Sequence, residues 1–145
     1  MIDSQTKAEF ALNTELQTKV TDIPLVFPNM PYTPSVTGEF IRVSHIPGQK
    51  RQATLGSTGR NRISGVLTLY VSYPVSNESI GTYRVNDTAG RLISYFSRGT
   101  KLTYDDVVVT CERAQRTGSF GDESRYTAVV EIPWYAYTAK DTATS

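Results

Sequence analysis

Nucleophiles and bases suited to catalysis are scarce in this sequence. It contains one cysteine, Cys111, and one histidine, His45, and no carboxylate lies close to His45 along the chain. A single cysteine excludes an intrachain disulfide and gives no metal-ligand spacing. A hydrolytic triad needs a base beside its nucleophile, and none is indicated here. We therefore expect no catalytic residue, no metal site and no cofactor, and we expect Cys111 to be a buried, inert thiol.

Long hydrophobic runs are also absent. No apolar run approaches the roughly 20 residues that span a bilayer, and the first ten residues lack the apolar centre of a signal peptide. We expect the protein to stay in the compartment where it is made, without a membrane partner. A length of 145 residues suits one domain over residues 1–138, followed by a polar, flexible tail at 139–145.

Acidic residues are missing from one long stretch, between Phe40 and Asn77, although the chain as a whole has a net charge of only +1. Solvated loop charge is one explanation for the basic side chains that remain there. The other is a basic surface that faces nucleic acid or an acidic partner. The basic residues of the stretch are Arg42, Lys50, Arg51, Arg60 and Arg62.

The first 20 residues predict a helix. Ala8, Leu12 and Leu16 recur every four residues and form a narrow apolar stripe. Phe10 lies well off that stripe. It either packs sideways against a sheet or anchors another chain, and we favour the anchor.

The longest β-type run is Asn61–Val75, in which polar and apolar residues alternate. A period of two over this length is typical of a half-buried strand in an antiparallel sheet. Glu39–Ile46 alternates in the same way, and Gln49–Leu55 can return as a further strand. Leu25–Phe27, among prolines, can form only a short edge strand.

A second helix is predicted over Thr82–Arg98, followed by Gly99 as the residue that stops it. Five apolar residues share one of its faces: Val85, Ala89, Leu92, Ile93 and Phe96. Three arginines seven residues apart form a line nearly opposite that face: Arg84, Arg91 and Arg98. Such a line is either a solvated face or, with its aromatic neighbour Tyr95, part of an interface.

The last third predicts a hairpin of Val107–Arg116 and Arg125–Thr138 around a glycine-containing loop. In the second strand Trp134 follows Pro133, which predicts a bend or a sheet edge there. Together these elements predict an α+β fold. It consists of one mainly antiparallel, twisted sheet of about 4–6 strands, with two helices packed on one face.

Several segments, in this order and spacing, resemble a known family. They are PLVFPN, FIRVSHIP, TLGSTGRNRISGVLTLYVSYPV, LISYFSRGT and VEIPWYAYT. The chain resembles, over about Ile2 to Thr138, the tail terminator-like proteins of tailed bacteriophages, small tail-completion proteins with a gpU-like α+β fold.

The resemblance implies structural work in a virion. Such proteins form a hexameric ring that caps the head-proximal end of the tail tube, stops its polymerisation and offers a docking face to the head–tail connector. The implied partners are other copies of the chain, the tail tube protein and the connector or neck protein, while DNA passes through the lumen without sequence-specific binding. The family has no catalytic residues or cofactors, and its members are made in the host bacterial cytoplasm. Two alternatives stay open: another head–tail joining protein of the same fold, and a nucleic-acid-binding module.

Our interface hypothesis follows from charge, because a closed ring needs a head-to-tail contact between two different surfaces. One copy would present Phe10 and the arginine line of Arg84, Arg91 and Arg98, and its neighbour would present acidic turns. The acidic residues are Asp105, Asp106, Asp122 and Glu123. The basic loop of Lys50, Arg51, Arg60 and Arg62 would serve the same contact or face the tube or the lumen.

Overall fold

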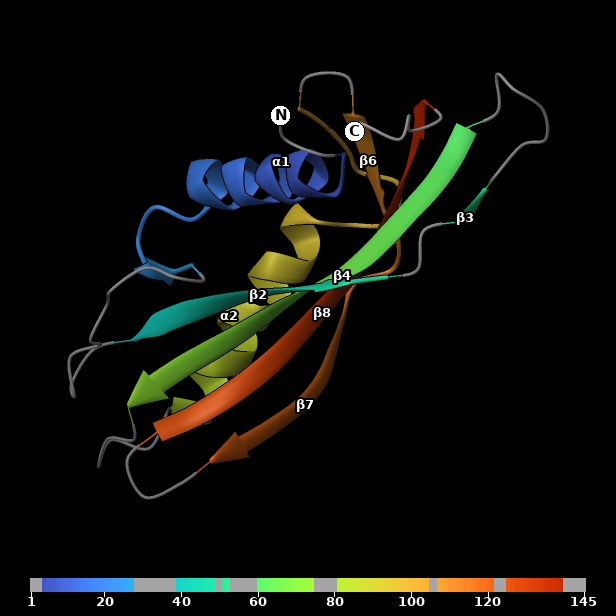
Figure 1. Cartoon of the computed structure of the whole chain (residues 1–145). Helices are drawn as coiled ribbons and strands as arrows, with labels where there is room; N and C mark the ends of the chain where they lie inside the picture. The colour runs from blue at the N-terminus through green and yellow to red at the C-terminus, as the bar shows by residue number, and fades with distance from the viewer. Residues whose placement is uncertain are drawn as a thin grey trace.

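Two helices and a curled, mixed sheet make up the described part of the chain (Figure 1). The computed structural model describes residues 4–27, 39–48, 51–52, 60–74, 81–104, 107–121 and 125–139. The elements are α1 (Ser4–Lys19), β1 (Leu25–Val26), β2 (Phe40–Pro47), β3 (Arg51–Gln52), β4 (Arg60–Pro74), α2 (Gly81–Tyr95), β5 (Lys101–Tyr104), β6 (Val107–Cys111), β7 (Gln115–Gly121) and β8 (Arg125–Ala139).

The centre of the sheet is the antiparallel pair β4 and β8. Each is 15 residues long, and they pair along their whole length, from Arg60 opposite Ala139 to Pro74 opposite Arg125. The strand order is β1-β2-β4-β8-β6-β5, with β3 also on β4 and β7 also on β8. Only β1 with β2 is a parallel pair among the pairings described.

Eight strands of the sheet lie in the described residues, so the expected 4–6 was too few. The predicted strand Val107–Arg116 is divided: β6 ends at Cys111, and Gln115 and Arg116 begin β7, which continues into the predicted loop. The two glycines and the polar side chains of β7 are typical of a turn. Pairing with β8 holds β7 in place, with a bulge between Arg116 and Gly118. β5 has only four residues and pairs with β6. Each of them pairs with the next strand along the chain, Tyr104 with Val107 and Gly121 with Tyr126. They were missed because β5 is short and because β7 is polar and contains glycine, which gives both a weak strand signal.

Pro133 marks a change of neighbours along β8, not a bend or a sheet edge as predicted. On one side of β8, β7 pairs up to Glu131, and β6 pairs from Trp134 onward. Between them, the Glu112 amide donates to the Pro133 carbonyl at 2.8 Å. A proline lacks the N–H that a continuous partner strand would accept, so it suits the gap between two partner strands.

The predicted alternation of faces is confirmed in both long strands. In β4, Leu67, Leu69 and Val71 are fully buried. In β8 every second residue is buried, and the set is Ala128, Val130, Ile132, Trp134 and Ala136. These side chains form the floor of the hydrophobic core.

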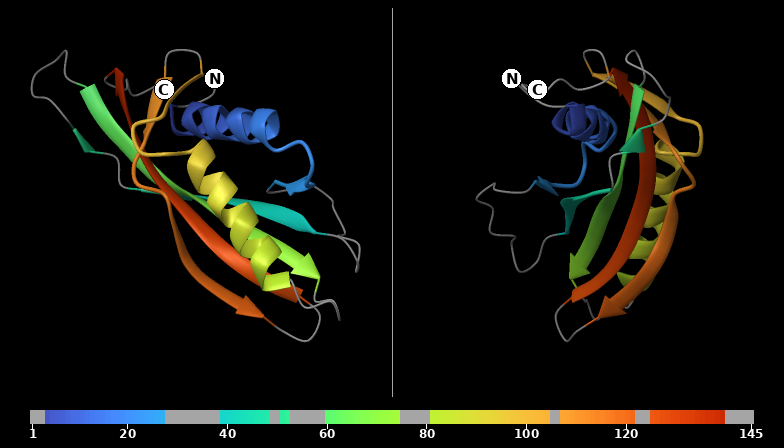
Figure 2. Two further views of the ribbon diagram at one scale, coloured as in Figure 1. Left: turned by 180° about the vertical axis from the view of Figure 1, so that it is seen from behind. Right: turned by 45° about the vertical axis from the view of Figure 1, so that its right-hand side comes forward.

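Both helices cover this apolar face (Figure 2). α1 packs on β4, β5 and β6, and α2 packs on β4, β7 and β8. The predicted stripe of α1 is buried, and it consists of Ala8, Leu12 and Leu16. On α2, Val85, Ala89 and Leu92 are buried as predicted, whereas Ile93 is only partly buried. Phe96 is fully buried but follows the end of the helix. Two hydrogen bonds of 2.8 Å also join helix to sheet, Asn13 with His45 and Thr88 with Tyr73.

The second helix ends at Tyr95, three residues before the predicted end. The chain leaves the helix because its backbone pairs with β6: the Cys111 amide donates to the Thr100 carbonyl, and the Gly99 amide donates to the Cys111 carbonyl, both at 2.8 Å. Gly99 has a φ of +88°, as expected of a glycine in a turn, but this turn leads into β5 and does not cap the helix.

Candidate assembly surface

One face of the sheet is turned away from both helices, and no described element covers it (Figure 1). We call it the open face and define it by four rows of register partners across β2, β4 and β8. The rows are Phe40–Ser72–Thr127, Arg42–Tyr70–Val129, Ser44–Thr68–Glu131 and Ile46–Val66–Pro133.

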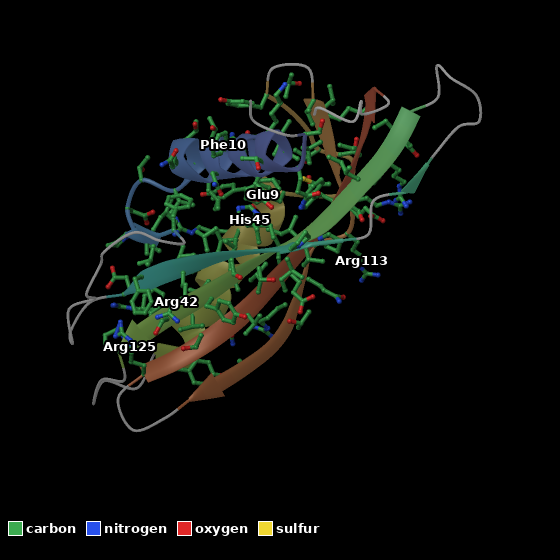
Figure 3. The ribbon with its side chains drawn as sticks, viewed as in Figure 1. Glu9, Phe10, Arg42, His45, Arg113 and Arg125 are labelled. Carbon is green, nitrogen blue, oxygen red and sulfur yellow. The ribbon has the colours of Figure 1, made fainter. Side chains whose placement is uncertain are left out.

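Arginine and aromatic side chains lie together at one end of the open face (Figure 3). The Arg125 guanidinium carbon is 4.7 Å from the centroid of the Phe40 ring, and Arg125 Nε donates to Ser72 Oγ at 2.9 Å. Arg42, two residues beyond Phe40 on the same strand face, is exposed and stands opposite Tyr70. Within the described ranges it forms no ion pair or hydrogen bond. Arg42 is therefore available to a partner, whereas Arg125 is held by its neighbours.

The middle of the open face is apolar and poor in acid. Ile46 is 53% exposed, and Val66 and Tyr70 are half-buried. Glu131 is the single carboxylate among the twelve defining positions. Thr68 is 3% exposed, and its hydroxyl has no hydrogen-bond partner among the described atoms. Aromatic and arginine side chains with few carboxylates are typical of protein–protein interfaces.

A second basic cluster lies at the other end of β4 and β8, around Arg62. Its guanidinium carbon is 4.8 Å from the Tyr135 ring centroid, and its Nη2 is 3.9 Å from Glu112 Oε1. Tyr137, 45% exposed, contacts Tyr135 edge-on. The two 15-residue strands twist along their length, so the sheet is rotated between its two ends (Figure 2).

The predicted basic loop is only partly described. Arg51 stands opposite Arg62 in the β3–β4 register, and Arg60 begins β4. Lys50 lies outside the described residues. The structure therefore places Arg51, Arg60 and Arg62 on two paired strands, so these three are not loop residues.

The predicted arginine line on the second helix is reduced to two members. Arg84 and Arg91 lie on α2, but Arg98 comes after the helix ends. Arg91 Nη2 is 3.3 Å from Asp22 Oδ2, so much of its charge is balanced within the subunit. The predicted acidic counterparts, Asp105, Asp106, Asp122 and Glu123, lie outside the described residues.

Phe10 packs sideways against the sheet, the first of its two predicted roles, and the favoured role as an anchor for another chain stays a prediction. Its ring packs edge-to-face on Tyr104 of β5, with centroids 5.5 Å apart, and it is still 37% exposed. Figure 3 shows it on α1 next to Glu9. The two rings form a partly exposed aromatic pair on the helix-covered side of the sheet.

Neither of the two residues with catalytic potential is charged at neutral pH. Burial lowers the pKa of His45 to about 4, and Asn13 Oδ1 lies 2.8 Å from its Nε2. Burial, with a smaller contribution from Glu15, raises the pKa of Cys111 to about 12. In the part of the chain that the structure describes, no three His, Cys, Asp or Glu side chains are grouped as metal ligands. None of its helices combines the length and the apolar character of a membrane span.

The low pKa of His45 predicts acid destabilisation. The unfolded chain takes up a proton near pH 6.5 and the folded chain only near pH 4, so the stability from a neutral His45 is present above pH 6.5 and is lost as the pH falls to 4. After allowance for partial solvent exposure, we expect a loss of about 2 kcal/mol. Chemical denaturation of the wild type and His45→Gln across this range measures it. The stability gap between the two should narrow as the pH falls, and a constant gap would contradict the assignment.

The sequence matches the family described as "Phage tail terminator protein" over residues 7–134. The chain belongs to the phage tail terminator family. This confirms the resemblance found in the sequence and indicates a structural component of a phage tail. Seven chains of solved structures also match. One of them, at 14% identity and a TM-score of 0.66, covers 92% of this chain and 98% of its own, which supports the fold alone. No curated protein matches.

The open face of this tail terminator family member was not predicted as a site, although the sequence held a signal for it. The acid-free stretch from Phe40 to Asn77 folds into β2, β3 and β4. The two strands that supply Arg42 and Tyr70 therefore bring no carboxylate to the open face. Which β8 residues join the open face depends on the register between β4 and β8. That register brings together residues far apart in the sequence, such as Ser72 and Arg125, which are 53 positions apart.

Proposed function

We propose that this chain is a ring-forming tail terminator, a structural protein of a tailed phage. Six copies close into a ring at the head-proximal end of the tail tube and join the tube to the neck of the virion. Membership of the tail terminator family over residues 7–134 carries this proposal. The open face supports it, because Arg42, Tyr70 and the exposed Ile46 suit contact with protein.

Simple geometry is compatible with such a ring. A compact chain of 145 residues is about 38 Å across. Six equal discs in a closed ring leave a central hole as wide as one disc, again about 38 Å. A DNA duplex is roughly 20 Å wide, so it passes with room for side chains.

The assembly state tests the proposed function. Light scattering after size exclusion should give a particle of six copies, about 97 kDa from a 16.1 kDa chain, and negative-stain images should show sixfold rings. The same images should show rings at one end of added tail tubes. A particle that stays monomeric both alone and with tubes would overturn the proposal.

The exposed Arg84 on α2 is a second candidate contact, with another copy or another tail protein. Arg84→Glu should weaken ring formation or binding to tail tubes, because reversing an exposed interface charge slows association and makes it repulsive. Arg91→Glu is measured as a second charge reversal on α2. It also breaks the 3.3 Å contact between Arg91 and Asp22. Scattering mass and co-sedimentation with tubes measure the effect. If neither quantity changes, α2 is not in the interface.

Binding to DNA distinguishes the alternative class. A nucleic-acid-binding module should retain duplex DNA with an affinity that falls steeply as salt rises. The net charge of +1 and the distribution of arginines over separate clusters favour protein contacts instead.

A further inference from the structure

We propose that the open face is one half of the contact between neighbouring copies, and that the Phe10–Tyr104 aromatic pair of the next copy is the other half. The inference rests on the proposed ring and adds the residues that build it. A second copy of this chain is the occupant to which the open face is assigned.

The two surfaces lie on opposite sides of the subunit. The open face is the side of the sheet that the helices leave uncovered, whereas Phe10 is on α1 and Tyr104 is on β5, which α1 covers. A contact between two different patches is heterologous, and a heterologous contact whose rotation closes generates a ring. A self-complementary patch would stop at a dimer.

The chemistry of the two patches is complementary. The open face offers an exposed Arg42, without an ion pair among the described residues, beside Tyr70 and Ile46, and the opposite patch offers two aromatic rings. A guanidinium is attracted to the face of an aromatic ring, and Arg125 already makes such a contact with Phe40 within the subunit.

Charge excludes the α2 surface as the counterpart. The exposed Arg84 there would meet Arg42 as a like charge, and Arg91 is already paired with Asp22. The whole chain has fifteen basic and fourteen acidic residues. Arg42 and Arg125 against Glu131 give this part of the open face one positive charge in excess, which equals the net charge of the whole chain.

The open face is small for a single protein–protein contact. Three strands at about 4.8 Å spacing and eight residues at about 3.3 Å each give roughly 380 Å² on one partner. Two such surfaces bury about 760 Å² together, which is below the roughly 1,000 Å² of a stable pairwise interface. In a ring, each copy makes two of these contacts, so a modest single contact still gives a stable assembly.

Two complementary variants test the pairing. Arg42→Glu with Tyr70→Ala disables the open face, and Phe10→Ser disables the aromatic pair. Arg116→Glu is the matched control, because it is an exposed arginine of β7 whose register partner, Val130, faces the helices. Circular dichroism melts establish that each variant is folded. We expect each disabling variant to lower the ring fraction at least about tenfold, with little change in the control.

Mixing the two disabled variants gives the decisive readout. Each retains one intact half, so an equimolar mixture should form a species of two copies by sedimentation velocity, while each variant alone stays monomeric. If the wild type forms rings and either folded variant forms them equally well, this inference is overturned. The proposed ring itself would still stand. Because a single contact is small, the mixture is measured at the highest protein concentration that stays soluble, and a mixture that is monomeric there would also overturn the inference. Wild type that never assembles, alone or on tail tubes, would instead overturn the proposed function.

Discussion

Replacing Trp134 with alanine should lower the free energy of unfolding by about 3–5 kcal/mol, because it removes the largest fully buried side chain and leaves a cavity. Trp134 is 1% exposed and lies at the crossing of β4, β6 and β8, opposite Gly65 on one side and Cys111 on the other. For a chain of this size the melting temperature should fall by about 10 °C. Urea unfolding with a two-state fit measures the change.

Trp134→Phe separates the packing of this residue from its polarity. The indole N–H has no hydrogen-bond partner among the described atoms, and an unsatisfied buried donor is costly. Phenylalanine fills less of the core than tryptophan, but it also removes this donor. We expect it to cost clearly less than Trp134→Ala, about 1 kcal/mol. An alanine variant that unfolds at the wild-type urea concentration would show that Trp134 does not organise the core.

Gly65→Ala is the second substitution with a large expected effect. An added Cβ would lie 2.8 Å from Trp134 Cζ2 and 3.0 Å from the Ile46 carbonyl oxygen, closer than real Cβ atoms come to their neighbours. The carbonyl belongs to β2, which is held by its ladder with β4, so it cannot move away cheaply. Overpacking of this kind costs about 1–3 kcal/mol, even though alanine is otherwise the better residue inside a strand.

A double-mutant cycle and a matched glycine make this prediction specific. In the Trp134→Phe background the added methyl has more room, so Gly65→Ala should cost at least about 0.5 kcal/mol less than in the wild type. Gly90 on α2 is exposed, and a methyl group added there would meet nothing within 4 Å, so Gly90→Ala should stabilise by about 0.5–1 kcal/mol. Equal effects at Gly65 and Gly90 would contradict the clash.

Local pattern predicted the parts of the fold whose order comes from apolar spacing. The period of two in β4 and the spacing of Ala8, Leu12 and Leu16 both correspond to buried faces. The pattern failed where backbone pairing orders a segment that has little apolar periodicity. β7 is polar and contains glycine, yet it pairs with β8, and the end of α2 is set by the pairing of Thr100 with Cys111.

The candidate site was predictable only in its charge. The lack of acid between Phe40 and Asn77 indicated a basic surface, and the structure places Arg42 on one. Which residues accompany Arg42 depends on the register of three strands, and no local signal fixes that register across 53 residues. The contact between Arg91 and Asp22, which are 69 positions apart, was also not predictable from local sequence. Because of it, Arg91 is less available to a partner than the predicted arginine line assumed.

The change of partners at Pro133 divides one flank of β8 into two segments, whereas β4 runs unbroken along its other flank. In a ring built through the open face, force that enters at Phe10 and Tyr104 would cross the sheet from β5 through β6, β8 and β4 to β2. The ladder between β8 and β4 is the longest on that path. The many backbone hydrogen bonds of that ladder would share the load. The stiffness of the ring would then depend on the main-chain hydrogen bonds between strands, so surface side chains could be replaced without lowering it.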